Sequence, residues 1–401
     1  MRHKILVTTT TFPRWANDTT PRFVYELCER LAAKYGVIVV APHAQGSLKK
    51  EKIGKLDVKR FAYFKPESMQ KLCYNGGIMP NMKESFLAKI QLPSLIFCEF
   101  IACRKIMKRE NVSMVHAHWI LPQGLVAVFL KKFFKVPLLV TVHGTDLFPL
   151  KKIFYRMLQN FVIKNADFAT VNSKATENEL LQRFPEHSAK IKTIPMGIDI
   201  KIFRKIKIKK PKKYSKNKIL LFVGRLSEQK GLQYLIESLS SIVKRYPKAK
   251  LLVIGEGAYK KTLQEIVNKK KLGKYVEFLG AMPSSELPKH YNFADVFILP
   301  SLSAKTGTEA LGLSLLEAMS CGCAVIGTDV GGIKYIIKNG YNGIIVRQKD
   351  SNAISNAIIK LLGNKKMAEK FGKNAAEFAR KNYSWENAAK EFIRLYDKIL
   401  K

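Results

Sequence analysis

Two carboxylates stand eight residues apart in one short, otherwise largely apolar stretch. Glu309 and Glu317 are the first and last residues of the run Glu-Ala-Leu-Gly-Leu-Ser-Leu-Leu-Glu. On a helix, positions separated by eight residues lie about 80° apart, so both carboxylates could face one ligand-binding cleft. The alternative is an ordinary amphipathic helix with two solvated glutamates. The loop and strands predicted around the stretch favour a loop position for Glu309 and a helical position for Glu317.

A pair of cations follows another strand-like run, Ile219 to Val223. Gly224 and Arg225 come directly after it, and Lys230 is five residues further on. We expect the glycine to permit a tight turn, while Arg225 and Lys230 would suit a diphosphate by charge and hydrogen bonding. The alternative is two surface cations among the 70 Lys and Arg of the chain. A Walker-type phosphate loop is missing from the sequence, which argues against nucleotide hydrolysis.

Three of the seven histidines stand at or just past predicted strand ends. They are His116, His118 and His143, and each could exchange a proton or form hydrogen bonds at a cleft. The alternative for each is a structural histidine whose hydrogen bonds are satisfied inside the protein. The sequence has no Asp-x-Asp, so a metal held by carboxylates against a diphosphate has no obvious ligands. We therefore expect no metal and assign charge neutralisation to the cations.

Short apolar strands and helical segments alternate around all of these residues. This alternation is typical of a parallel sheet covered by helices, which binds ligands outside the carboxyl ends of its strands. In the first half we predict a helix over 23–34 and strands over 4–9, 37–41, 114–117, 138–142 and 168–171. In the second half we predict strands over 219–223, 251–254, 276–279, 296–299 and 324–327.

A run of lysines and arginines over 201–218, broken by Pro211, separates the two halves. It has no apolar periodicity, so we read it as an exposed linker. The predicted fold class is α/β, with two Rossmann-like, doubly wound parallel-sheet domains facing a cleft. The predicted segments are an acceptor-binding domain, a linker, a second domain and a C-terminal helix that packs back elsewhere, over 1–205, 206–217, 218–382 and 383–401.

Positive charge dominates the composition, with 70 Lys and Arg against 31 Asp and Glu and a net charge of +39. The charge predicts an anionic partner: nucleic acid, an anionic membrane face or a phosphorylated substrate. The longest apolar stretch, 92–103, contains Glu99 and is shorter than the about 20 residues that a spanning helix needs. The N-terminal apolar run is too short for a signal peptide, and the six cysteines lack zinc-site or redox spacing. We expect a cytoplasmic globular protein with reduced thiols and no transmembrane helix.

Together these motifs resemble those of the retaining glycosyltransferases of the GT-B type, family four, over nearly the whole chain. Glu309 and Glu317 are similar to the Glu-x7-Glu pair of that family, and Gly224-Arg225 with Lys230-Gly231 is similar to its diphosphate clamp. The last helix of the family crosses back onto the first domain. Three further segments also match the family pattern: 195–199, 328–332 and 383–385.

The resemblance implies a role for each residue of the second half. Glu317 would accept hydrogen bonds from the ribose of a nucleotide sugar, and Glu309 would contact the transferred sugar as a catalytic residue. Gly224, Arg225 and Lys230 would hold the leaving diphosphate without a metal. A helix starting near Ala310 would point its positive end at the same phosphates. The donor sugar or its neighbouring backbone would be contacted by Ala310, Leu311 and Gly312.

In the first half, the resemblance implies that His118 is catalytic and lies close to the reacting sugar carbon. His143 would be its neighbour on the acceptor side, and His116 would be structural. The chain departs from the family at two places: Ala310 stands where a glycine is usual, and Lys334-Tyr335 stands where Pro-Glu is frequent. Both departures bear on donor preference and leave the fold prediction unchanged.

The acceptor is expected at the loop over 9–21, where Arg14 and Trp15 look exposed. The alternative is a capped surface loop. Two basic and aromatic runs, 131–135 and 151–156, suit an anionic membrane interface. We therefore expect peripheral membrane binding on the inner face of the cell membrane and a lipid-linked or polysaccharide acceptor. The alternative for the lysine excess is the composition of the genome.

The sequence as a whole predicts a metal-independent, retaining glycosyltransferase that takes its sugar from a nucleoside diphosphate sugar and needs no cofactor. The expected setting is the synthesis of cell-surface polysaccharide or glycolipid. Two alternatives stay open. One is a basic nucleic-acid-binding protein, although the sequence shows no helix-turn-helix, zinc-finger or aromatic RNA-binding signature. The other is a sugar-nucleotide epimerase of the same fold.

Overall fold

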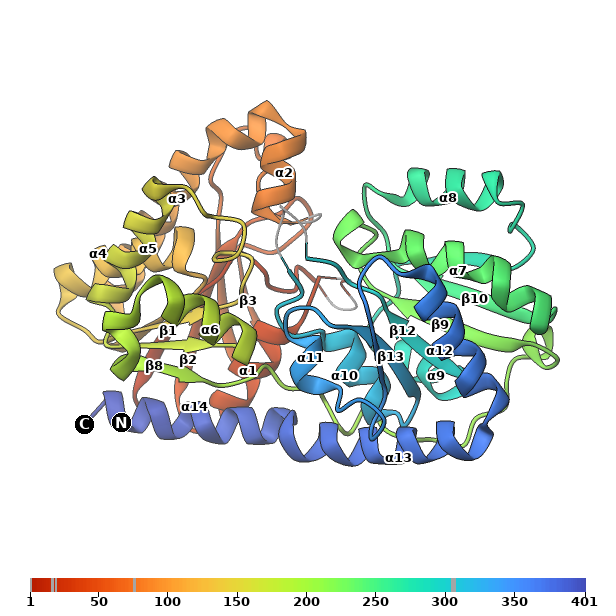
Figure 1. The fold of residues 1–401 in the computed structure, drawn as a ribbon. Helices are drawn as coiled ribbons and strands as arrows, with labels where there is room; N and C mark the ends of the chain where they lie inside the picture. Colours follow the sequence, from red (N-terminus) through yellow and green to blue (C-terminus); the bar gives the residue numbers. More distant parts are fainter. Residues whose placement is uncertain (1, 16–17, 19, 75–76, 304–307) are drawn as a thin grey trace. The chain divides into compact units, whose positions relative to one another are not determined.

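The computed structural model describes residues 2–15, 18, 20–74, 77–303 and 308–401. The chain forms two compact units, which we call the N-terminal unit (1–195 and 386–401) and the C-terminal unit (196–385). Each unit is a mainly parallel sheet covered by helices (Figure 1). The α/β class and the two doubly wound domains expected from the sequence are therefore confirmed.

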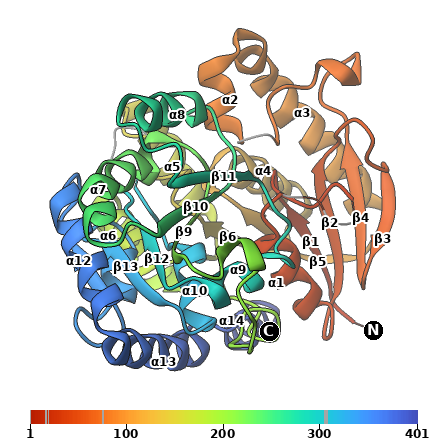
Figure 2. The same ribbon diagram turned by 90° about the vertical axis from the view of Figure 1, so that its right-hand side faces the viewer.

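The N-terminal unit contains an eight-stranded sheet in the order β3-β4-β2-β1-β5-β6-β7-β8. The five strands expected in this half are present as β1, β2, β5, β6 and β7. Two strands that were not expected, β3 and β4, form a hairpin at the edge of the sheet (Figure 2). β3 is antiparallel to β4, so the sheet is not wholly parallel. The strand bounds are β1 Lys4–Thr8, β2 Gly36–Pro42, β3 Lys50–Ile53, β4 Leu56–Phe61, β5 Val112–His118, β6 Leu138–Val142, β7 Phe168–Val171 and β8 Ile191–Thr193.

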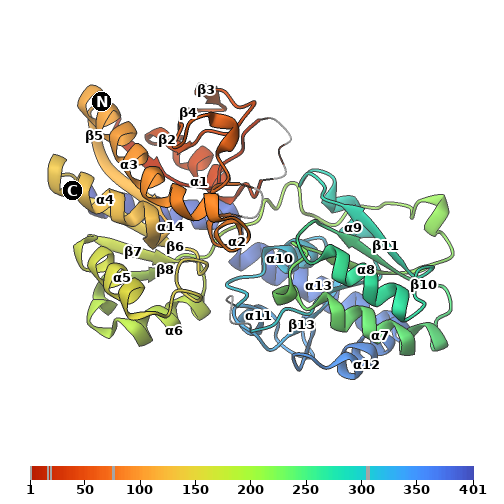
Figure 3. The ribbon, with the colours of Figure 1, turned by 90° about the horizontal axis from the view of Figure 1, so that it is seen from above.

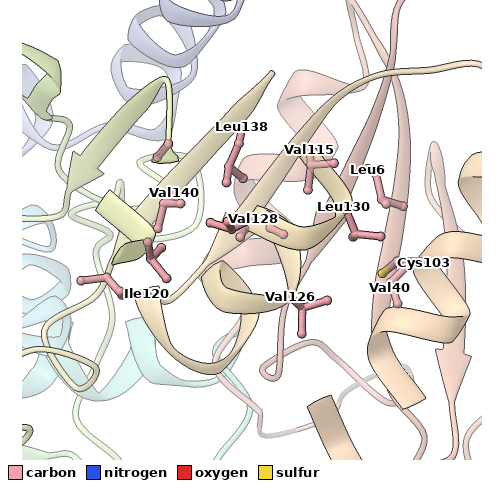
Figure 4. Close-up of a cluster of buried hydrophobic side chains, with 14 of the residues drawn as sticks. Leu6, Val40, Cys103, Val115, Ile120, Val126, Val128, Leu130, Leu138 and Val140 are labelled. Carbon is pink, nitrogen blue, oxygen red and sulfur yellow. The ribbon is translucent and has the colours of Figure 1, made fainter. Parts of the chain in front are cut away.

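The helices of this unit bury one face each against the sheet or against a neighbouring helix. The core includes side chains from β1, β2, β5, β6, α3 and α4, such as Leu6, Cys103, Val126 and Leu138 (Figure 4). These side chains are almost completely removed from water, which is the main source of stability of such a layer. The helix bounds are α1 Phe23–Leu31, α2 Ile78–Glu84, α3 Phe86–Arg109, α4 Leu125–Phe134, α5 Ile153–Asn165, α6 Lys174–Arg183 and α14 Trp385–Ile399.

Helix α3 is longer than the apolar stretch identified in the sequence. By length and composition it is the one helix, within the described residues, that could cross a membrane, and this criterion alone is weak evidence. Its buried side chains include Leu95, Glu99 and Cys103. One face of α3 therefore belongs to the core of the unit.

The C-terminal unit contains a six-stranded sheet in the order β11-β10-β9-β12-β13-β14, with all recorded pairs parallel. The five strands expected from the sequence are present. The strand bounds are β9 Lys218–Val223, β10 Ala249–Ile254, β11 Val276–Gly280, β12 Val296–Leu299, β13 Ala324–Thr328 and β14 Ile344–Val346. The helices are α7 Leu232–Arg245, α8 Lys260–Lys269, α9 Leu287–Phe293, α10 Leu313–Ser320, α11 Ile333–Ile336, α12 Ser351–Gly363 and α13 Lys365–Asn382.

The boundaries between the units differ from those expected. They fall at 195/196 and 385/386, because residues 196–205 are bound to the C-terminal unit. Ile198 donates a backbone hydrogen bond to Tyr383 at 2.7 Å, and Ser320 Oγ donates to the carbonyl of Phe203 at 2.5 Å. Segment 206–217, expected to be an exposed basic linker, is anchored as well: Lys210 is paired with Asp295 and Tyr214 is buried.

Both sheets change winding direction once. The strand numbering reverses between β1 and β5 in the N-terminal unit and between β9 and β12 in the C-terminal unit. At such a point, the loops after two neighbouring strands turn to opposite faces of the sheet and leave room for a ligand at the carboxyl ends. Each unit therefore offers one candidate site, formed by the loops that follow these pairs of strands.

Candidate functional site

The candidate site of the C-terminal unit is built from the loops after β9 and β12. β9 ends at Val223 and is followed by Gly224 and Arg225, and β12 ends at Leu299 and is followed by Pro300 and Ser301. The two loops are joined by a hydrogen bond of 2.7 Å from the backbone N–H of Leu302 to the carbonyl of Gln229. This bond places the short turn Glu228–Lys230 beside the end of β12.

Lys230, Ser301 and Glu309 meet in one cluster, which we call the lysine–glutamate cluster. Lys230 Nζ and Ser301 Oγ both donate to Glu309 Oε2, the latter over 3.0 Å. Burial raises the pKa of Glu309, but the charges and hydrogen bonds of Lys230, Ser301 and Arg225 outweigh it and hold the pKa below its usual value. Glu309 is therefore an ionised carboxylate at neutral pH, and Lys230 is held in place by it.

Two glycines fix the backbone around this cluster. Gly231 has φ +67°, and a Cβ there would lie 1.8 Å from the carbonyl oxygen of Pro300. Gly331 has φ +49°, and a Cβ there would lie 1.9 Å from the carbonyl oxygen of Glu309. Both positions combine a backbone conformation that favours glycine with an approach too close for any side chain. The loops that carry Lys230 and Glu309 are therefore held in place by close backbone packing.

Two details of the sequence prediction are wrong in this region. Gly224 does not adopt a positive φ, and a Cβ built on it meets only ordinary contacts, so no tight turn of the protein requires this glycine. The helix expected near Ala310 begins at Leu313, because Gly312 takes a left-handed conformation with φ +84° and ends the loop. Glu309, Ala310 and Leu311 are thus loop residues, as the flanking pattern favoured for Glu309.

Glu317 lies in helix α10 and has a different environment from Glu309. Its Oε2 accepts a hydrogen bond of 2.8 Å from the hydroxyl of Tyr291, which comes from α9 and is fully buried. Burial raises the pKa of Glu317 to about 7, although the Tyr291 hydrogen bond acts in the opposite direction. One carboxyl is therefore kept ionised and the other is poised to titrate near neutral pH.

This difference predicts a pH dependence for nucleotide-sugar affinity. If Glu317 binds ribose hydroxyls, only its ionised form accepts both hydrogen bonds, so affinity should rise between about pH 6 and pH 8, by up to roughly tenfold per unit below the pKa. A nucleotide sugar is the suitable ligand because neither phosphate of its diester chain titrates there. Titration calorimetry at a series of pH values measures the effect.

The Glu317→Gln variant is the control for that measurement. It should bind more weakly at pH 8 and lose most of the pH dependence. The raised pKa also means that the contribution of Glu317 to the stability of the ligand-free protein is present at low pH and is lost as pH rises through about 7. An unchanged pH profile in Glu317→Gln would show that another group causes the dependence.

The N-terminal unit brings the three histidines predicted from the sequence, His116, His118 and His143, together at the ends of β5 and β6. His118 is the last residue of β5, and His143 follows β6 directly. His118 Nδ1 and His143 Nε2 are 2.9 Å apart and share a hydrogen bond, while His118 Nε2 is buried without a recorded partner. Both ring nitrogens of His116 are bonded inside the protein, to the Tyr396 hydroxyl and to Thr141 Oγ1, each at 2.7 Å.

Burial keeps these histidines neutral. It lowers the pKa of His118 to about 3 and holds the pKa of His143 well below its usual value, where the nearby His118 acts in the same direction. At neutral pH the pair can thus accept and donate hydrogen bonds but does not supply a positive charge. Within the described part of the chain, His118 Nε2 is a buried ring nitrogen without a hydrogen-bond partner, so a ligand could satisfy it.

Asp146 and Trp119 complete this arrangement. Asp146 is buried and accepts hydrogen bonds from the backbone N–H groups of Ile120, His143 and Gly144 at 2.6–3.1 Å, so it ties the loops after β5 and β6 together. Trp119 has φ +78°, and its ring lies tilted by 40° against the His143 ring, with 4.7 Å between ring centroids. The strained backbone of Trp119 is a feature that functional loops often contain.

Of the two loop residues expected to be exposed, Trp15 is exposed and Arg14 is not. The Arg14 guanidinium is bound by both carboxylate oxygens of Asp18, and its side chain is only 16% exposed. It also lies 4.3 Å from the Trp15 ring centroid. Arg14 therefore fastens the loop, because an ion pair between residues four apart closes it, while Trp15 stays partly exposed. Residues 16, 17 and 19 of this loop lie outside the described residues.

Several residues of the candidate sites were not identified from the sequence. Ser301, Tyr291 and Asp146 are ordinary polar residues in the sequence, and only their distances in the fold assign them partners. Asp146 could have been identified from the sequence, because an aspartate in the turn after a strand often accepts hydrogen bonds from backbone N–H groups of that turn. Within the described residues, no three side chains of His, Cys, Asp or Glu gather as a metal site requires.

Comparison with known proteins identifies the family of this chain. The model of the family described as Glycosyltransferase Family 4 matches residues 20–202, and that described as Glycosyl transferases group 1 matches residues 203–378. An uncharacterised glycosyltransferase of Methanocaldococcus jannaschii is 30% identical over 307 residues, which cover 73% of this chain and 76% of the relative. The D-inositol 3-phosphate glycosyltransferase of Corynebacterium urealyticum is 27% identical, with 77% of each chain covered.

Solved structures show the same fold. Sucrose-phosphate synthase from Thermosynechococcus elongatus is 24% identical, covers 99% of both chains and has a TM-score of 0.82. Anabaena HepE, solved in complex with UDP-glucose, is 17% identical with a TM-score of 0.73, covering 98% of this chain and 99% of its own. At these identities the similarity describes the fold.

Proposed function

We propose that this chain, which belongs to the GT-B glycosyltransferases of family four, transfers a sugar from a nucleoside diphosphate sugar with retention of configuration. The acceptor is proposed to be a hydroxyl group of a lipid-linked saccharide or polysaccharide. The proposed place of the reaction is the cytoplasmic side of the cell membrane. The proposed reaction requires no cofactor and no metal.

The lysine–glutamate cluster is the observation that carries this proposal. It lies in the loops after β9 and β12, where a doubly wound sheet binds ligands. Lys230 is mostly buried and is already held in place before a ligand binds. Such a cation can stabilise the negative charge that develops on a leaving diphosphate. In the proposed complex, Lys230 and Arg225 contact the diphosphate, Glu309 the transferred sugar and Glu317 the ribose.

The bond changes follow from these positions. The bond between the anomeric carbon and the diphosphate oxygen breaks, and the acceptor oxygen bonds to the same face of that carbon. The acceptor proton passes to the leaving phosphate oxygen, so charge and atoms balance. Lys230 and Arg225 stabilise the departing diphosphate, and His118 is assigned the role of a neutral hydrogen-bonding group. Departure and attack on one face give retention.

A product analysis tests the proposed function. The protein is incubated with a panel of nucleoside diphosphate sugars and a membrane-lipid extract, and the anomeric configuration of any glycoside is determined by NMR. The proposal predicts a glycoside with the anomeric configuration of the donor. Inversion would contradict the retaining mechanism. Conversion of the donor without any acceptor would indicate an epimerase.

A further inference from the structure

Exposed aromatic and aliphatic side chains gather on one flank of the N-terminal unit. Of the fifteen large apolar side chains that are exposed among the described residues, eight belong to α3, α4 and α5. Each leaves 50–76% of its surface exposed, and together they are Phe86, Ile90, Phe97, Phe129, Phe133, Ile153, Phe154 and Met157. Figures 1 and 3 show the three helices next to one another. We call this surface the α3–α5 face.

Helix α3 is apolar on two sides, and only one of them is used by the core. Phe86, Ile90 and Phe97 follow one another at helical spacing on its exposed side, while Leu95 and Cys103 point into the core. An ordinary surface helix has polar residues on the side that faces water. The exposed side of α3 therefore requires an explanation other than the packing of this unit.

Side-chain contacts link α3 to α4 and α4 to α5 at this surface. The guanidinium of Arg104 on α3 lies 5.2 Å from the ring centroid of Phe133 on α4. Phe129 on α4 and Phe161 on α5 have ring centroids 6.5 Å apart, and Lys132 lies over the same Phe161 ring at 5.1 Å. Contiguous apolar patches of more than a few hundred Å² are rare on monomeric soluble proteins and mark interaction sites.

The charges on this face have one sign. The three helices carry nine lysines and arginines, and their one acidic residue, Glu99, is buried. Burial also raises the pKa of Glu99 to about 8, so it is largely neutral at physiological pH. Since the whole chain contains 31 acidic residues, their absence from this exposed surface is a local property in addition to the general excess of lysine.

A cationic cavity borders the same face. It has a volume of about 540 Å³ and lies at the end of α4 and the starts of β6 and β7. Four lysines and one carboxylate surround it, and that carboxylate, Asp167, is paired with Lys131 at 2.6 Å. The lysines are Lys131, Lys132, Lys135 and Lys398. A phosphate group would find several cations and an apolar wall formed by Val136, Pro137, Phe168 and Ile399.

We propose that the α3–α5 face docks on an anionic lipid surface, with its aromatic side chains at the acyl boundary and a lipid phosphate in the cavity beside α4. Aromatic and aliphatic groups mixed with lysine and arginine match the two layers of such a surface. A protein partner of equal apolar character would not need the uniform positive charge. The opposite side of α3 is part of the core, so the helix lies on the bilayer and does not cross it. The proposal does not depend on sugar transfer.

Vesicle flotation with the full-length protein, in the absence of any donor, tests this proposal. The wild type should float with phosphatidylcholine vesicles that contain phosphatidylglycerol. With vesicles of phosphatidylcholine alone it should remain in the bottom fraction of the gradient. Replacing Phe97, Phe133 and Phe154 with serine leaves the net charge unchanged and should weaken vesicle binding at least about tenfold. Replacing Lys131 and Lys135 with serine should weaken it about fivefold per lysine.

Matched controls and a second measurement make the result decisive. Tyr341→Ser and Lys366→Ser change an exposed aromatic residue and an exposed lysine of the C-terminal unit, and both variants should float like the wild type. Light scattering reports whether the α3–α5 face instead joins two copies. A wild type that does not float, serine variants that float equally well, or a dimer that the three phenylalanine changes dissociate would overturn the proposal. Circular dichroism confirms that each variant is folded.

Discussion

Replacing Lys230 with alanine is expected to lower the rate of sugar transfer by about 10²–10³-fold, which is the usual loss when one charge-stabilising donor is removed. Lys230 is fixed by Glu309 and by the turn ahead of Gly231, so it is positioned before the donor binds. In the variant, the diphosphate loses its nearest cation and Glu309 becomes a mostly buried carboxylate with less charge compensation. The specific activity of purified protein, measured at saturating donor, reports the loss.

The fold of the Lys230→Ala variant must be checked beside its activity. Lys213→Ala is the matched control, because Lys213 is also in the C-terminal unit and is paired with a carboxylate, Glu277, at 2.8 Å. It should keep wild-type activity. We expect Glu309→Ala to be as inactive as Lys230→Ala, because both residues act on the same donor. Wild-type turnover in either folded variant would show that the cluster is not the catalytic site.

Replacing His118 with alanine is expected to lower transfer about 10²-fold, since an uncharged hydrogen-bonding group near the developing charge contributes on this scale. The neutral state of His118 sharpens the prediction. Because burial lowers its pKa to about 3, His118 does not titrate between about pH 5 and pH 8, and it should add no step to the pH–rate profile of the wild type there.

His118→Asn separates this role from a purely structural one. Asparagine can still offer a polar group to a ligand, so it should recover part of the activity that alanine loses. His3→Ala, which changes an exposed histidine of the same unit, should behave as the wild type. Equal activity of His118→Ala and the wild type would place the reacting carbon away from β5. A pH–rate step that disappears in His118→Asn would contradict the neutral histidine.

The sequence was sufficient to predict the two sheets, because buried parallel strands are continuous apolar runs and helices have a different period. It also identified Lys230 and Glu309, which are 79 residues apart in the chain and hydrogen-bonded in the structure. It missed the hairpin β3–β4, whose outer strand β3 has the sequence Lys-Glu-Lys-Ile and no buried residue. An edge strand buries little, so its pattern is weak.

Contacts that the spacing of residues does not reveal account for the other differences. Arg14 looked free because its partner, Asp18, is a neighbour in a loop with no regular spacing. The basic segment 206–217 looked like an exposed linker because its anchors, Lys210 paired with Asp295 and the buried Tyr214, follow no apolar periodicity. The roles of Ser301 and Tyr291 depend on which loops the strand order brings side by side, and a strand order is not visible in the spacing of residues.

The most direct test of the account is a thermal-shift panel of nucleoside diphosphate sugars on the wild type and Lys230→Ala. A ligand that binds only the folded protein raises its melting temperature. We predict that one base and sugar combination stabilises the wild type clearly and stabilises Lys230→Ala much less at the same concentration. If no nucleotide sugar raises the melting temperature, or if wild type and Lys230→Ala respond equally, the lysine–glutamate cluster is not the donor site.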